Sequence, residues 1–131
     1  WINYHIAPGQ TAQEVMTRAQ QVTKGLDVQL SWEGGRAIDP SPVSSATSDG
    51  WKILAALASE GGSVPVAPGL VTAGTDSRYM TGVAQDVYRF APMHASVEEF
   101  AMIHGTNEHM SLENLQRLTD FYTRLIATAA G

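Results

Sequence analysis

The sequence has no cysteine, few basic residues and no long apolar run, and each absence excludes a class of protein. Without cysteine there is no disulfide and no thiolate metal site, so a metal would need His, Asp or Glu ligands. Eight Lys and Arg against 13 Asp and Glu give a formal charge of −5, which does not support nucleic-acid binding. No run of about 18 apolar residues is present, so we expect no membrane-spanning helix.

The residues that are present are those of a globular protein. Of the 131 residues, 44% are hydrophobic and 16% are charged, which suits one modest domain better than a disordered chain. The chain begins at Trp1 without an initiator Met, so we expect a processed or partial chain. These totals leave the compartment open.

Local signals divide the N-terminal part into a strand, a helix and a second strand. The opening residues WINYHI and the segment LDVQLSW (26–32) alternate apolar and polar residues, which predicts half-buried strands. Thr11 and Glu14 form a capping box for a helix that Gly25 ends. Two strands and one helix bury too little to stand alone, so they predict half of a small α/β sandwich.

A stretch rich in Pro, Gly and Ser, GGRAIDPSPVSSAT (34–47), predicts a domain boundary. Beyond it, either Ser48 or Asp49 caps a helix over 51–59, and strands are expected at 64–72 and 86–90. Ser96 and Glu99 form a second capping box, and Ser111 caps the last helix. The buried stripe of that last helix is predicted to comprise Leu112, Leu115, Leu118, Tyr122, Leu125 and Ala129.

The stretch AMIHGTNEHMS (101–111) raises the question of a metal site. His104 is either a zinc ligand or a helix C-terminal residue that the helix dipole favours, with Gly105 as a left-handed cap. Glu108 would then support the ligand or be a ligand itself. These residues alone favour the helix end, because a zinc site needs three or four ligands.

Three other places carry polar groups that could serve a site. At AGTDSR (73–78), Thr75 and Arg78 lie in a glycine turn that can bind a carboxylate or oxyanion, or that starts a capped helix. Both interpretations stay open, since they are compatible. His5 by itself is a half-buried strand residue, and the neighbours Glu98 and Glu99 are solvated rather than a catalytic pair.

Taken in order, the motifs NYHIAPGQTAQEV, DPSPVSS, AGTDSRY, VYRFAPM and IHGTNEHMSLENL resemble one enzyme family. They resemble the C-terminal part of the zinc metallopeptidases related to carboxypeptidase S and aminoacylase, a family that includes carboxypeptidase G-type enzymes. The resemblance covers essentially all of the chain. It implies an α/β fold: half of a small α+β lid (strand-helix-strand), residues 1–38, followed by the C-terminal part of an α/β zinc-peptidase catalytic domain, residues 39–131.

The resemblance also implies roles for single residues. His104 matches the last zinc ligand of the family, and Glu108 matches the acidic residue that follows it. Thr75 matches a substrate-contacting position, and Arg78 lies in the same motif. His5 stands where the family usually has an Arg that binds the substrate carboxylate, and a protonated His cannot make the bidentate fork of Arg. No catalytic residue is expected within this chain.

These matches predict the C-terminal portion of a two-zinc amidohydrolase that cleaves a C-terminal peptide bond or an N-acyl amino acid. In such enzymes two zinc ions acidify a water molecule and polarise the amide carbonyl, and a carboxylate transfers the proton. One His cannot hold two zinc ions, so activity is expected to need the N-terminal half of the enzyme. A homodimer is expected through the lid. The alternative is a non-enzymatic binding module on the same scaffold, against which the presence of His104 and Glu108 speaks.

Overall fold

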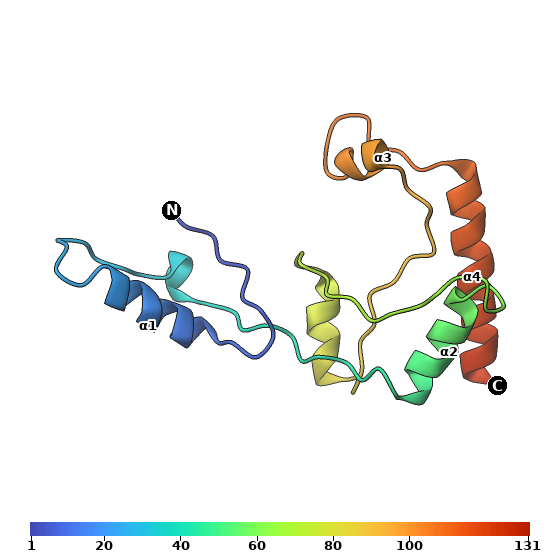
Figure 1. The fold of residues 1–131 in the computed structure, drawn as a ribbon, viewed down its shortest axis with the longest axis horizontal. Helices are drawn as coiled ribbons and strands as arrows, with labels where there is room; N and C mark the ends of the chain where they lie inside the picture. Colours follow the sequence, from blue (N-terminus) through green and yellow to red (C-terminus); the bar gives the residue numbers. More distant parts are fainter. The chain divides into compact units, whose positions relative to one another are not determined.

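The computed structural model describes residues 1–131 and contains six helical elements and no strand (Figure 1). In chain order these are α1 (Ala12–Val22), η1 (Glu33–Gly35), α2 (Asp49–Ala58), η2 (Asp76–Gly82), α3 (Val97–Ala101) and α4 (Leu112–Ala130), of which η1 and η2 are 3-10 helices. The chain forms two compact units. The first comprises residues 1–44 and 71–87, and the second comprises residues 45–70 and 88–131.

Every α-helix begins at a hydroxyl side chain that the sequence predicts as its cap. Thr11 and Ser96 form complete capping boxes with Glu14 and Glu99, so that both helix entrances have their first free N–H groups bonded. Of the two cap candidates for α2, Ser48 is the cap, and its hydroxyl accepts from the Trp51 amide at 3.3 Å. The expected helix starts are therefore confirmed.

The predicted strands are wrong for this structure, and with them the strand-helix-strand lid and the α/β fold class. The segments around 1–6, 26–32, 64–72 and 86–90 form no ladder of backbone hydrogen bonds. Alternating residues give a strand only one apolar face, and the strand forms only if a neighbour satisfies its N–H and C=O groups. Several apolar side chains of the first two segments also stay in solvent, with Ile2 78% and Leu26 63% exposed.

In the first unit, two side chains from residues 34–47 form hydrogen bonds to the backbone of other segments. The Asp39 carboxylate accepts a hydrogen bond at 2.8 Å from the amide of Ala12, the first residue of α1, and Ala12 is buried. This places a negative charge at the helix N-terminus, where the helix dipole favours it. The Ser44 hydroxyl bonds both backbone groups of Val87, accepting from its N–H at 2.8 Å and donating to its C=O at 3.0 Å.

In the second unit, α2 packs along α4 (Figure 1). Its small core lies at Phe121, whose ring centroid is 5.2 Å from that of Phe90 and 5.5 Å from that of Tyr122. The Tyr122 hydroxyl donates to the Phe90 carbonyl at 2.7 Å, so the segment before α3 is fixed to α4 by packing and by a hydrogen bond.

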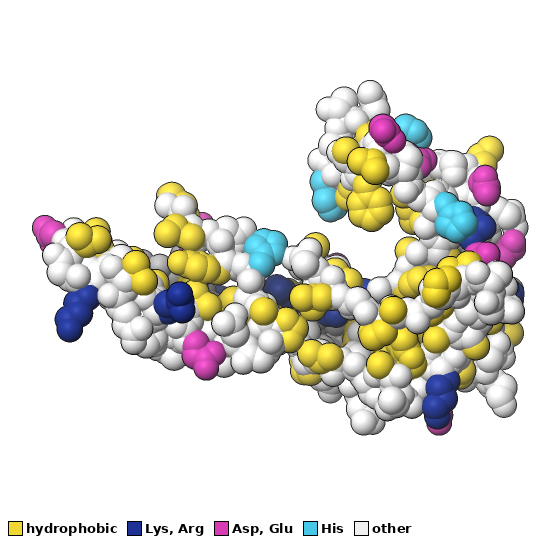
Figure 2. Space-filling model, viewed as in Figure 1, with side chains coloured by type: hydrophobic (Ala, Val, Ile, Leu, Met, Phe, Trp, Pro, Cys, Tyr) yellow, Lys and Arg dark blue, Asp and Glu magenta, His cyan; other side chains and the backbone are white.

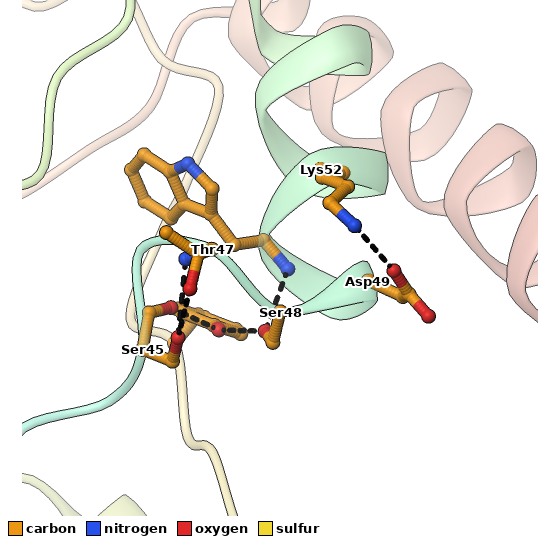
Figure 3. A network of polar contacts seen from close by, with 7 residues as sticks. Ser45, Thr47, Ser48, Asp49 and Lys52 are labelled. Atoms are coloured by element: carbon orange, nitrogen blue, oxygen red, sulfur yellow. Dashed lines mark hydrogen bonds and ion pairs between the residues drawn. The ribbon is translucent and has the colours of Figure 1, made fainter.

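The entrance of α2 is fixed by a group of hydroxyls (Figure 3). The Tyr88 hydroxyl lies 2.6 Å from the Ser48 hydroxyl and donates to the Ser45 carbonyl at 2.6 Å. The Tyr88 ring packs on Trp51, with ring centroids 5.9 Å apart. Residue 50 is glycine at a point where a Cβ would meet the Tyr88 ring at 3.5 Å. The segments 45–51 and 88 are thereby joined, although about 40 residues separate them.

The apolar stripe predicted for α4 is largely wrong. Leu118 and Leu125 are half-buried, but Leu112, Leu115, Tyr122 and Ala129 are exposed, and the buried residues of the helix are Asn114 and Phe121. Figure 2 shows hydrophobic side chains over much of the visible surface. Large hydrophobic side chains of both units are exposed, among them Ile2 at 78%, Val83 at 82% and Val97 at 83%. Large exposed apolar areas are typical of surfaces that another piece of protein covers.

Candidate functional site

The connection between α3 and α4 holds His104 in a tight turn. The Gly105 amide donates to the Met102 carbonyl at 2.8 Å, and His104, the third residue of this turn, has φ +60°. That pattern is a type II turn, whose third position normally takes Gly or Asn. A side chain in this left-handed region costs about 1–2 kcal/mol, and such strain is found mostly at functional sites.

The expectation that Gly105 forms the left-handed cap is wrong, because His104 takes that conformation instead. Gly105 has its own reason to be glycine, since a Cβ there would lie 3.1 Å from the Met102 carbonyl oxygen. The His104 side chain is exposed, and its imidazole makes no hydrogen bond to the protein. Both ring nitrogens are therefore open to a ligand or a metal ion.

Glu108 supports this turn through the backbone. Its carboxylate oxygen Oε2 accepts a hydrogen bond from the His104 backbone N–H at 3.2 Å, not from the imidazole. Next to it, His109 Nδ1 lies 2.6 Å from the Asn107 carbonyl oxygen, and Asn107 is also left-handed, at φ +62°. Because a carbonyl only accepts, the ring proton of His109 is on Nδ1. The segment 102–109 is thus closed by contacts among its own residues.

Thr75 and Arg78 lie at the start of η2, in the first unit. Thr75 occupies the capping position, yet its hydroxyl does not cap the helix and bonds the Ser77 hydroxyl instead. The Arg78 amide donates to the Thr75 carbonyl at 3.2 Å, and the guanidinium lies beside Gly74. The turn therefore brings two hydroxyls and a half-buried guanidinium to one short segment.

His5 is exposed and lies in the same unit as this turn. Its Nδ1 is 2.7 Å from the carbonyl oxygen of Thr72, three residues before Thr75. The carbonyl can only accept, so the proton is on Nδ1 and Nε2 points away from this contact. His5 is thereby connected to the segment that leads into Thr75.

One polar cluster in the second unit was not expected from the sequence. Arg117 donates through Nη2 to the Glu60 carboxylate and to His94 Nε2, the latter at 3.0 Å. The Asn114 side chain, 3% exposed, bonds the His94 backbone in both directions, at 2.9 Å each. The sequence indicates only a loop at His94, and no spacing pattern relates it to a residue on α4.

Two carboxyl groups have a lowered pKa, and neither belongs to the His104 turn. The hydrogen bond from Lys52, and then the charge of that ammonium, lower the pKa of Asp49. A hydrogen bond from its own backbone N–H, and then one from the Ser96 hydroxyl, lower the pKa of Glu98. Both groups lie in the first turn of a helix, where a negative charge is favoured.

A complete metal centre is not formed by these residues alone. No group of three or more His, Asp or Glu side chains comes together in the structure, whereas zinc in proteins takes three or four such ligands. The exposed His104 imidazole suits a single ligand of a site whose other ligands come from elsewhere.

None of the helices has both the length and the apolar composition of a membrane-spanning segment.

A family model described as peptidase family M20/M25/M40 matches residues 2–128, so the chain belongs to this family of peptidases. The resemblance predicted from the motifs is therefore confirmed, and with it the assignment to a family of hydrolytic enzymes.

Among curated proteins, the chain is 31% identical over 126 residues to a probable carboxypeptidase S-like 2 of Dictyostelium discoideum. It is 38% identical over 127 residues to the N-fatty-acyl-amino acid synthase/hydrolase PM20D1 of Xenopus tropicalis. Each match covers 95% of this chain but 24% of the relative. The human PM20D1 is 33% identical over 134 residues, which is 98% of this chain and 26% of that protein. The chain thus spans about a quarter of the length of these relatives, and no solved structure matches it.

Proposed function

We propose that this chain is the C-terminal portion of a zinc-dependent amidohydrolase that cleaves a C-terminal peptide bond or an N-acyl amino acid. Membership of a peptidase family supports hydrolysis. The names of the relatives, carboxypeptidase S-like and N-fatty-acyl-amino acid synthase/hydrolase, support these two substrate classes. The large exposed apolar surface and the quarter-length matches support a need for the rest of the enzyme.

The observation that carries the proposal is the His104 turn. His104 is an exposed imidazole at a backbone position that favours glycine, so retaining His there has a conformational cost with no packing gain. In the proposed enzyme His104 is the last zinc ligand. When bound, two zinc ions supply Lewis-acid activation of the scissile carbonyl and of the attacking water. The other ligands and the general base lie in the N-terminal half.

The first unit supplies the proposed substrate contacts. Thr75 offers a hydroxyl and Arg78 a guanidinium, which are suitable donors to an anionic substrate group. His5 offers Nε2, with its ring orientation set by the Thr72 carbonyl. Since an imidazolium gives one donor here where Arg gives a fork, we expect weaker selectivity for a terminal carboxylate than with Arg at this position.

The division of the chain and its partners belong to the same proposal. Residues 1–38 form the second half of a lid and dimerisation domain, without the strands expected there, and residues 39–131 form the C-terminal part of the catalytic domain. The N-terminal half of the same enzyme covers the exposed apolar side chains of this region.

The test is the zinc content of the full-length enzyme with His104→Ala. We expect one of the two zinc ions per chain to be lost, measured by mass spectrometry of metals on purified protein. His109→Ala is the matched control, because it removes another exposed imidazole from the same turn region. An unchanged zinc content in His104→Ala would contradict the proposed function.

A further inference from the structure

The His104 turn is held by two hydrogen bonds with different origins. One is the turn bond from the Gly105 amide to the Met102 carbonyl, at 2.8 Å. The other comes from a side chain: Glu108 Oε2 accepts from the His104 backbone N–H at 3.2 Å. The second bond acts on the residue that is in the left-handed conformation, at φ +60°. It is a side-chain contact to the His104 main chain, so it is the bond that a single substitution at Glu108 can remove.

The geometry separates two roles that a carboxylate beside a ligand can have. A carboxylate that orients a ligand through its ring must accept from an imidazole N–H. Glu108 instead contacts the main chain and leaves both His104 ring nitrogens available. A main-chain N–H needs only an acceptor oxygen, which a neutral amide side chain also has. A neutral acceptor can also accept from a ring N–H, whereas a carboxylate that binds the metal depends on its charge. Gln therefore separates the main-chain role from metal binding, and exchange of the His104 amide proton separates it from a contact with the ring.

We infer that Glu108 is a positioning residue for His104 that acts through the main chain, so that its acceptor oxygen is required and its charge is not. The inference rests on the proposed role of His104 as a zinc ligand. In this arrangement Glu108 fixes where the imidazole is presented, and the strained backbone is part of that presentation.

The experiment compares Glu108→Gln, Glu108→Ala and Glu113→Gln in the full-length enzyme. Zinc affinity is measured by competition with a chelator of known affinity, and exchange of the His104 amide proton by mass spectrometry. We expect Glu108→Ala to weaken zinc binding by about 10- to 100-fold and to speed exchange of that proton. Glu108→Gln is expected to restore both quantities to within about threefold of the wild type. Glu113, an exposed carboxylate in the first turn of α4, is the control for loss of a nearby charge.

Three results would overturn the inference. If Glu108→Gln is as damaging as Glu108→Ala, the charge is needed and the residue acts on the metal. If Glu108→Ala weakens zinc binding but leaves exchange of the His104 amide proton unchanged, the residue acts on the ring. If Glu108→Ala leaves the zinc affinity unchanged, Glu108 does not position His104 for zinc binding.

A further variant separates this inference from the proposed function. His104→Gly suits the left-handed backbone, so it should keep or raise the melting temperature of the metal-free enzyme, while the zinc-loaded enzyme loses one zinc ion. A His104→Gly enzyme that keeps both ions contradicts the ligand role itself, whatever the Glu108 variants do.

Discussion

Replacing Asn114 by Leu is expected to speed exchange of the His94 amide proton by about 30-fold. Asn114 is 3% exposed, and its amide accepts from the His94 N–H and donates to the His94 carbonyl, both at 2.9 Å. Leu has the same number of side-chain heavy atoms and the same branching but neither polar group, so both bonds are lost. At about 1 kcal/mol per hydrogen bond, local opening becomes easier by about 2 kcal/mol, which is about 30-fold in the opening equilibrium.

The assay is hydrogen exchange followed by mass spectrometry on peptides that cover residues 91–96 of the full-length enzyme. Asn114→Asp should give an intermediate rate, because the carboxylate still accepts from the His94 N–H but cannot donate to its carbonyl. Gln116→Leu is the control on the same helix, since Gln116 is exposed and bonds only Asp120, at 2.8 Å. An increase below about threefold in Asn114→Leu, or an equal increase in Gln116→Leu, would refute this reasoning.

Two further outcomes concern the packing and the charge of the second unit. Phe121→Ala should destabilise α4 by about 3–5 kcal/mol, measured by hydrogen exchange, because a buried ring is lost. Tyr122→Phe loses one hydrogen bond to Phe90, so it should destabilise the helix by about 1 kcal/mol. The lowered pKa of Glu98 means that its ionised form stabilises α3, so this contribution is present above the unfolded pKa and is lost as pH falls through the folded pKa. After correction for the intrinsic pH dependence of exchange, the amides of α3 should therefore lose protection as the pH falls in the wild type. The loss should be smaller in Glu98→Gln. An equal loss in the two proteins would argue against a stabilising role of the ionised Glu98 carboxylate.

The helix starts could be predicted from the sequence because their determinants are local. Thr11, Ser96 and Ser111 each bond an amide three residues further along the chain, so the whole contact lies within one short stretch of sequence. The four expected strands do not form, since a strand depends on a partner that an alternating pattern does not identify. The α4 stripe was largely wrong for the same reason: which face is buried depends on the packing partner, and here that face includes Asn114.

In the candidate site, the residue types could be predicted from the sequence, but the backbone conformation and the long-range contacts could not. The motif around His104 identifies the family, but the sequence places the left-handed residue at Gly105, because glycine is the usual choice there. The structure places it at His104. The contact between His94 and Arg117, and the role of Asn114, join residues 20 or more positions apart, and no periodic pattern encodes them.

The order of the units along the chain has a consequence for synthesis on the ribosome. The first unit is interrupted by residues 45–70 of the second, and His5 meets its partner carbonyl only 67 residues later. At about 5–20 residues per second, the segment around His5 waits about 3–13 s for that partner to be translated. During this interval the exposed apolar residues Trp1 and Ile2 belong to a segment whose unit is not yet complete.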